Sequence, residues 1–182
     1  MASKLDKDRF VPPIMHAFRA AFRERDAARD IDRKTEDGER LIAGRRASPR
    51  SAVSEGILRQ ELADDLAALL NTVNLAAAED MTSFEHARNS ILNYGIADLT
   101  AIATNSRDID NLSKSMAATL ERFEPRLIPG TIVVKQEDTG DDASGRVRLH
   151  INADMHSTPV DVAVEFVAEI EPDSGKMKVS RL

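Results

Sequence analysis

Glu124, Pro125 and Arg126 place an acid, a ring and a base where a helical pattern changes into a strand pattern. Proline disfavours the α region for the residue before it, so we expect the preceding helix to end near Phe123. In an extended segment residues two apart point the same way, which puts Glu124 and Arg126 side by side with Pro125 opposite. Such a fixed pair suits recognition of an acidic partner group or a polar network with a neighbouring chain. The alternative is a surface ion pair that contributes about 0 to 1 kcal/mol.

The histidines are the other residues that could carry chemistry, as metal ligands. His16, His86, His150 and His156 show no HExxH or comparable spacing. His150 and His156 could approach one another near a strand turn with Asp154 between them, although polar residues on a strand face are the commoner explanation. Without cysteine there is no thiolate zinc site and no cysteine nucleophile, and the eight glycines form no phosphate-binding fingerprint. We therefore expect neither a metal nor another cofactor.

Length and composition favour one compact domain with extensions, because 182 residues are typical of a single domain. The formal charge of -6, one Tyr and no Trp argue against a nucleic-acid face, and the basic cluster at Arg45, Arg46 and Arg50 is a weak counter-signal. The sequence contains no apolar run of about 18 residues and no signal-like start. It therefore predicts a cytoplasmic protein without direct membrane insertion.

Residues 1–22 form an N-terminal docking segment in which Ile14, Phe18 and Phe22 recur every four residues behind two prolines. A helix this short cannot form its own core, so it packs on the rest of the chain or binds a partner, and both alternatives stay open. Residues 23–50 hold nine basic and seven acidic residues, which predicts a charged linker or a solvated helix.

The main domain is expected over residues 51–182, and its first half is helical. Ser54 is a candidate N-cap for a helix whose leucines lie on one stripe. That stripe comprises Leu58, Leu62, Leu66, Leu69 and Leu70. A second stripe comprises Ile109, Leu112, Met116, Leu120 and Phe123. Between the two helices the pattern predicts loops and short helices, with a turn at Tyr94-Gly95.

After Pro129-Gly130 the hydrophobic period becomes two, which predicts strands. The apolar positions expected to share one side of each strand are Val147, Leu149, Ile151 and Ala153, then Val160, Val162, Val164 and Phe166. Gly175 suits the hairpin that leads to a last short strand. Helices followed by strands predict an α+β fold, with helices packed on an antiparallel β-meander of about four strands.

Three stretches of the chain match a known family in order and spacing. They are "LADDLAALLNT" at 62–72, "SILNYGIADL" at 90–99 and "FEPRL" at 123–127. Together they resemble the TssE family of type VI secretion baseplate proteins over about residues 54–182. Ala97 departs from the pattern, because the family usually carries a proline there.

The resemblance implies a sheath-like baseplate wedge fold and a structural, non-enzymatic role. It implies TssF, TssG and TssK as wedge partners, the sheath subunits TssB and TssC, and assembly at the inner face of the bacterial inner membrane. On this chain, Glu124 and Arg126 would lock the wedge, with Pro125 setting their geometry. The edge of the meander would accept or donate a strand to a sheath subunit.

Two other functions stay as alternatives. Phage relatives of the family have been labelled lysozyme-like, which suggests a peptidoglycan hydrolase. An arginine beside Glu124 favours the ionised carboxylate, which opposes a general acid, and no second carboxylate is singled out. The other alternative is a regulatory adaptor of similar fold, which would bind through the segment that carries Ile14, Phe18 and Phe22.

Overall fold

The structure is a computed structural model, and the chain divides into two compact units, residues 1–61 and 62–182. The described residues are 10–23, 52–99, 106–137, 147–171 and 174–182. Residues 24–50 of the expected linker, with the basic cluster at Arg45, Arg46 and Arg50, therefore lie outside the described residues. None of the helices in the described ranges combines the length and the apolar character that a membrane-spanning helix needs.

The described part of the first unit consists of one helix, an isolated bridge and the start of a second helix. Helix α1 (Ile14–Arg23) follows directly after Pro12 and Pro13. Phe10 and Val53 are buried and form an antiparallel bridge, with N···O distances of 2.8 and 2.9 Å. Helix α2 (Glu55–Leu70) begins directly after Ser54, as the sequence predicted, and continues into the second unit.

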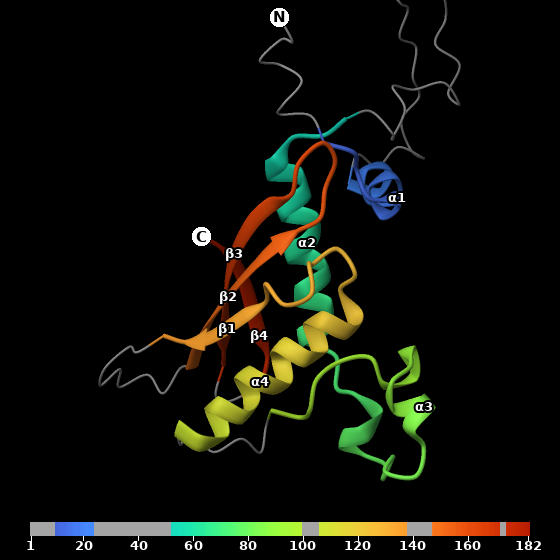
Figure 1. Ribbon diagram of the computed structural model, residues 1–182, viewed down its shortest axis with the longest axis vertical. Coiled ribbons are helices and arrows are strands. Elements are labelled where there is room, and N and C mark those ends of the chain that lie inside the picture. Colours follow the sequence, from blue (N-terminus) through green and yellow to red (C-terminus); the bar gives the residue numbers. More distant parts are fainter. Residues whose placement is uncertain (1–9, 24–51, 100–105, 138–146, 172–173) are drawn as a thin grey trace, which may run out of the picture. The chain divides into compact units, whose positions relative to one another are not determined.

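The second unit contains the rest of α2, a series of short helices, a long helix and a sheet (Figure 1). The short elements are η2 (Leu75–Ala77), α3 (Glu85–Arg88) and η3 (Ile91–Asn93), and the long helix is α4 (Ser106–Phe123). The strands are β1 (Val133–Gln136), β2 (Val147–Met155), β3 (Val162–Ile170) and β4 (Met177–Arg181). The predicted α+β fold with an antiparallel meander is confirmed.

The four strands lie in the order β1-β2-β3-β4, and every neighbouring pair is antiparallel. Burial alternates along β2 and β3, so one face of the sheet is covered and the other is open. Residues paired across strands share a face, as Ile151 and Phe166 do on the covered face. Val160 was expected on that face, but it precedes β3 and is exposed.

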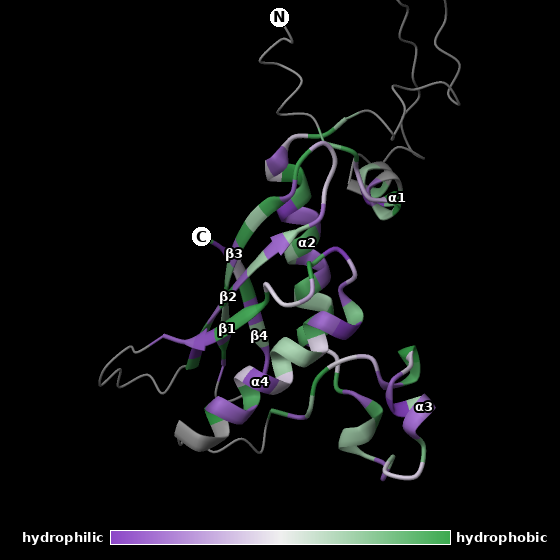
Figure 2. Ribbon diagram, viewed as in Figure 1, coloured by the Kyte–Doolittle hydropathy of each residue, from purple (hydrophilic) through white to green (hydrophobic). Residues whose placement is uncertain are grey.

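The core of the second unit comes from α2, α4 and the covered face of the sheet. Helix α4 lies close to β1, and hydrophobic and hydrophilic residues are interspersed along it (Figures 1 and 2). The largest fully buried side chains of this unit are Leu62, Leu66, Leu69, Leu70, Met116, Leu120, Leu149, Ile151 and Phe166. The predicted stripe residues from Leu62 to Leu70 on α2 and from Ile109 to Leu120 on α4 are therefore buried, whereas Phe123 at the end of the second stripe is half-buried.

The segment between α2 and α4 is held together by a close backbone approach at Gly95. Its φ is 114°, and the Ile96 N–H donates to the Thr72 carbonyl at 2.9 Å. The buried Asn93 side chain accepts from the Ala76 N–H at 2.8 Å and donates to the Arg88 carbonyl at 3.1 Å. The predicted Tyr94-Gly95 turn is thus the point where this segment returns to the end of α2.

We expect Gly95→Ala to destabilise the protein strongly, because an added Cβ would lie 2.1 Å from the Thr72 carbonyl oxygen. Gly130→Ala is the matched control, since Gly130 also has a positive φ of 83° but nothing within 4 Å of an added Cβ. The control should show only the backbone strain of about 1 to 3 kcal/mol. Urea denaturation measures both changes, and equal losses would contradict a steric role for Gly95.

Candidate interaction surfaces

The Glu-Pro-Arg turn, residues 124–127, begins where α4 ends. The last helical residue is Phe123, as predicted, and the Glu124 N–H still donates to the Leu120 carbonyl at 2.9 Å. The Leu127 N–H then donates to the Glu124 carbonyl at 3.1 Å, which closes a β-turn with Pro125 in its second position. The expectation of an extended segment was therefore wrong. The fixed φ of proline suits this turn position as well as it suits an extended chain.

Glu124 and Arg126 pair within this turn through two side-chain hydrogen bonds. Arg126 Nε donates to Glu124 Oε1 at 2.7 Å and Nη2 donates to Oε2 at 2.6 Å. The Arg126 backbone N–H adds a third bond to Oε1 at 3.2 Å. This bidentate geometry fixes the guanidinium plane. The two side chains meet as expected, but Glu124 is buried instead of being presented on the surface.

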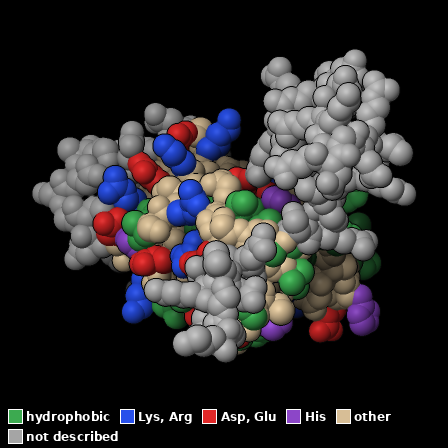
Figure 3. All heavy atoms as spheres, turned by 90° about the horizontal axis from the view of Figure 1, so that it is seen from above, with side chains coloured by type: hydrophobic (Ala, Val, Ile, Leu, Met, Phe, Trp, Pro, Cys, Tyr) green, Lys and Arg blue, Asp and Glu red, His purple; other side chains and the backbone are tan. Residues whose placement is uncertain are grey.

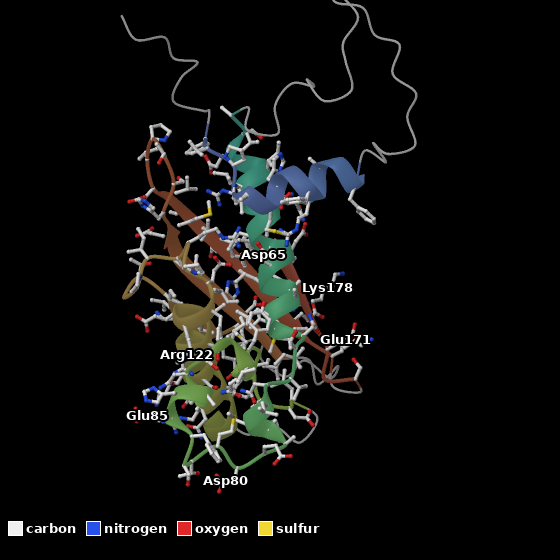
Figure 4. The ribbon with its side chains drawn as sticks, turned by 90° about the vertical axis from the view of Figure 1, so that its right-hand side faces the viewer. Asp65, Asp80, Glu85, Arg122, Glu171 and Lys178 are labelled. Atoms are coloured by element: carbon white, nitrogen blue, oxygen red, sulfur yellow. The ribbon has the colours of Figure 1, made fainter. Side chains whose placement is uncertain are left out.

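Asp65 is a third member of this cluster that sequence reasoning missed. Arg126 Nη2 also donates to Asp65 Oδ2 at 2.6 Å, across 61 residues of sequence. Figure 4 places Asp65 on α2. The sequence position of Asp65 could have indicated this contact, because Asp65 lies three residues after Leu62 and four before Leu69, on the apolar side of the helix. An acid at such a position needs a partner when the helix packs.

The environment of Arg126 keeps its guanidinium charged. Burial alone would lower the pKa of the guanidinium, but the hydrogen bond that it donates to Glu124 and the charges of Glu124 and Asp65 raise it, and the net direction is upward. Both carboxylates are therefore held by one permanent cation.

The turn is also fixed from its other side, by the end of β2. The Ile128 N–H donates to the Asp154 carbonyl at 2.8 Å, and the His156 N–H donates to the Arg126 carbonyl at 2.7 Å. Leu127 is buried and forms a bridge with Met155. The exposed residue of the turn is Pro125. A partner that approaches this surface would meet the proline ring and the partly exposed guanidinium edge beside it.

Helix α1 turns its polar side toward Glu61 of α2, within the first unit, and its apolar residues are exposed. Arg19 Nη1 donates to Glu61 Oε2 at 2.8 Å, and His16 Nδ1 lies 3.3 Å from Glu61 Oε1. Glu61 is fully buried, whereas Ile14, Phe18 and Phe22 are 80, 66 and 84% exposed. The three residues predicted as a docking stripe are thus accessible. Their role in binding a partner stays a prediction.

The histidines do not come together into a metal site. His150 lies on β2 and His156 just beyond it, and six residues of a strand span about 20 Å. Each has its own carboxylate: His150 Nε2 is 3.4 Å from Glu137, and His156 Nδ1 is 2.9 Å from Asp161. The possible approach of the two histidines is therefore contradicted. Across the described residues, no group of three or more potential ligands could hold a metal ion.

The open face of the sheet carries mixed charges rather than a patch of one sign. Arg148 lies between Glu137 and Glu169, at 4.0 and 3.7 Å. The surface seen from above in Figure 3 likewise shows basic and acidic side chains interspersed among the described residues. Exposed ion pairs of this kind contribute little stability and offer no uniform field for a charged partner.

The pKa of Tyr94 depends on the charges of the Glu124–Arg126–Asp65 cluster. Its ring packs edge to face on Phe123, with centroids 5.4 Å apart, and its pKa is raised above 10.0 by burial first and then by the charges of Asp65 and Glu124. Neutral tyrosine is thus favoured in the folded state. Any stability gained from this shift is present below the unfolded pKa of about 10 and is lost as pH rises through the folded value.

We expect an alkaline titration of tyrosinate absorbance to show a midpoint above 10.0, and Asp65→Asn to lower it part of the way back. The chain has one Tyr and no Trp, so the signal belongs to Tyr94 alone. Asp64→Asn is the matched control, because Asp64 is not among the causes of the shift. Circular dichroism at each pH keeps unfolding apart from titration. An equal effect of both variants would contradict the placement of Asp65.

Comparison with known families finds a match that covers more than half of the chain. The family described as baseplate wedge protein gp25 matches residues 57–160, a range that includes Asp65, Tyr94 and the Glu-Pro-Arg turn. No curated protein and no solved structure matches the chain. The predicted resemblance to TssE is confirmed, since this family includes TssE. The chain therefore belongs to the gp25 family of baseplate wedge proteins, a structural family.

Proposed function

We propose that this protein is the TssE-type component of a type VI secretion baseplate, in which it joins TssF, TssG and TssK in each wedge. The observation that carries the proposal is the gp25 family match, which contains all the residues of the Glu-Pro-Arg cluster. The role is non-enzymatic: the protein contributes fixed surfaces to an assembly. It acts in the cytoplasm, at the inner face of the bacterial inner membrane.

The Glu-Pro-Arg turn is the first surface that we assign to wedge contacts. Arg126 already donates hydrogen bonds to one carboxylate in its own turn and to a second on α2. Its position therefore does not depend on a partner protein. Preorganised groups lose less conformational entropy when they bind. Pro125 is the exposed part of this rigid turn, and we infer that TssF and TssG contact it there.

The β4 edge, residues Met177–Arg181, is the surface that we assign to the sheath subunits TssB and TssC. β4 is the last strand of the sheet, and no described strand pairs with its outer side. The Leu182 N–H donates to the Glu165 carbonyl, and the Lys176 carbonyl accepts from Glu171, so even-numbered residues bond to β3. In an antiparallel pair these bonds alternate, which turns the backbone of Val179 outward. A strand of the first sheath ring would pair there.

A regulatory adaptor is the second candidate function, and the exposed apolar stripe of α1 favours it. Ile14, Phe18 and Phe22 recur at the spacing of a helix that binds in an apolar groove. In the wedge proposal the same stripe adds a further contact to TssF or TssG. The adaptor function predicts instead that the stripe binds a regulator while the Glu-Pro-Arg turn is dispensable.

We expect the double substitution Glu124→Ala with Arg126→Ala to weaken co-purification with TssF and TssG by at least about ten-fold, or ~1.4 kcal/mol. The double variant is preferable to Arg126→Ala alone, because removing only the cation leaves a buried carboxylate unpaired and damages the fold. Pro125→Ala is the matched variant, since it retains the ion cluster and alters only the exposed surface. Thermal melting confirms that each variant is folded.

If the folded double variant and Pro125→Ala both bind TssF and TssG normally, the turn only ends a helix and supports the fold. Phe18→Asp with Phe22→Asp then tests α1, since both side chains are exposed and their replacement should leave the melting temperature unchanged.

We expect Val179→Pro to abolish strand pairing with TssB and TssC while the protein stays folded. The Val179 N–H points away from β3, so proline removes no bond inside the sheet. Ser180→Pro is the matched control: its N–H points toward β3, and its loss should unfold the edge. Sheath assembly on purified wedges measures the first effect and circular dichroism the second. Normal sheath initiation by Val179→Pro would contradict the assignment.

A further inference from the structure

The Asn71 side chain lies on the β4 edge and bonds to the backbone of the first residue of that strand. Asn71 Nδ2 donates to the Met177 carbonyl at 2.8 Å, and the Met177 N–H donates to Asn71 Oδ1 at 2.9 Å. The two residues are 106 positions apart in sequence. An N–H and a C=O on one residue are the two groups that a neighbouring strand would use, so the carboxamide stands in for one residue of an additional strand.

The position of Asn71 is fixed from its own side as well. It follows directly after α2, and its Nδ2 also donates to the Ala67 carbonyl at 2.8 Å. The two hydrogens of the amide thus have two acceptors, and the amide oxygen has one donor. Exchanging the amide oxygen and nitrogen would break all three bonds, so the orientation of the side chain is determined by its partners.

We propose that Asn71 is a positioning residue that ends the available β4 edge at Met177 and so sets the register of any strand that pairs there. This inference rests on the proposed pairing with the sheath. Outward backbone groups alternate along β4, so Met177 and Val179 belong to the same row. Because Asn71 occupies Met177, the first outward position that a sheath strand can use is Val179.

A fixed register matters because a shift by one pair of residues gives an equally good backbone match. Backbone bonds alone do not distinguish such registers, so an edge without a stop permits slippage and unwanted pairing. A side chain that covers one end of the row removes the shifted alternative. It does so without a proline in β4, which would weaken the strand itself.

The test is amide hydrogen exchange of the full-length protein, alone and with the purified TssB–TssC pair. In the wild type alone, we expect slow exchange at Met177 and fast exchange at Val179. Addition of the sheath pair should slow Val179 by at least about ten-fold, because its backbone bond must then open before exchange. Absence of this change in the wild type would overturn strand pairing at the β4 edge and the inference with it.

Asn71→Ala then tests the inference separately. We expect Met177 to exchange fast in the free variant and to become slow when the sheath pair is added, because the strand now extends over the vacated position. A variant in which the sheath pair protects Val179 but leaves Met177 fast would overturn the role of Asn71 while leaving strand pairing intact.

Asn71→Asp is the matched isosteric variant. It retains an acceptor for the Met177 N–H but loses the donor to the Met177 carbonyl, so we expect slow exchange at Met177 in both states. Protection of Lys178 and Ser180, whose amides bond to β3, shows in every variant that β4 is still in place. Loss of that protection only in Asn71→Ala would assign Asn71 to folding and overturn the proposal.

Discussion

The contact on which the second unit depends is the hydrogen bonding of one guanidinium to two carboxylates. Arg126 reaches Glu124 in its own turn and Asp65 on α2, both at 2.6 Å. Glu124 is buried, and a buried carboxylate without a partner costs several kcal/mol. The end of α4, the turn and α2 are therefore held in one arrangement, and the bonds from residues 126–128 to the end of β2 add the sheet to it.

A buried ion pair is a poor way to gain stability, since apolar residues of similar volume often give as much or more. What the cluster adds is the selection of one packing arrangement. Leucines on α2 and α4 can pack in several neighbouring arrangements. The bidentate pair and its third partner, by contrast, can form in only one of these arrangements. A protein that presents fixed surfaces to several neighbours in an assembly gains from such definition. The rigid turn leaves Pro125 exposed in a defined place.

The sequence was sufficient for features that local physics determines. Pro125 ended α4 at the expected residue, the hydrophobic periods gave both long helices and the sheet, and the alternation in β2 gave its covered face. The extended geometry at Glu124 was wrong, because a proline that ends a helix is compatible with a strand and with a turn, and only tertiary bonds select between them. The predicted burial of Val160 was wrong for a similar reason. Val160 fits the two-residue hydrophobic period of β3, but the strand begins two residues later.

The long-range partners escaped prediction because no local rule specifies them, yet they share one helix. Glu61 and Asp65 lie four residues apart on α2, and Asn71 follows its end. Glu61 holds α1, Asp65 holds the Glu-Pro-Arg turn, and Asn71 holds β4. These three segments are the ones to which we assign contacts with other proteins. Each assigned surface is thus tied by a polar side chain to the same helix, whose leucines build the core. Polar residues on or beside an apolar stripe are the feature by which a sequence alone can indicate such ties.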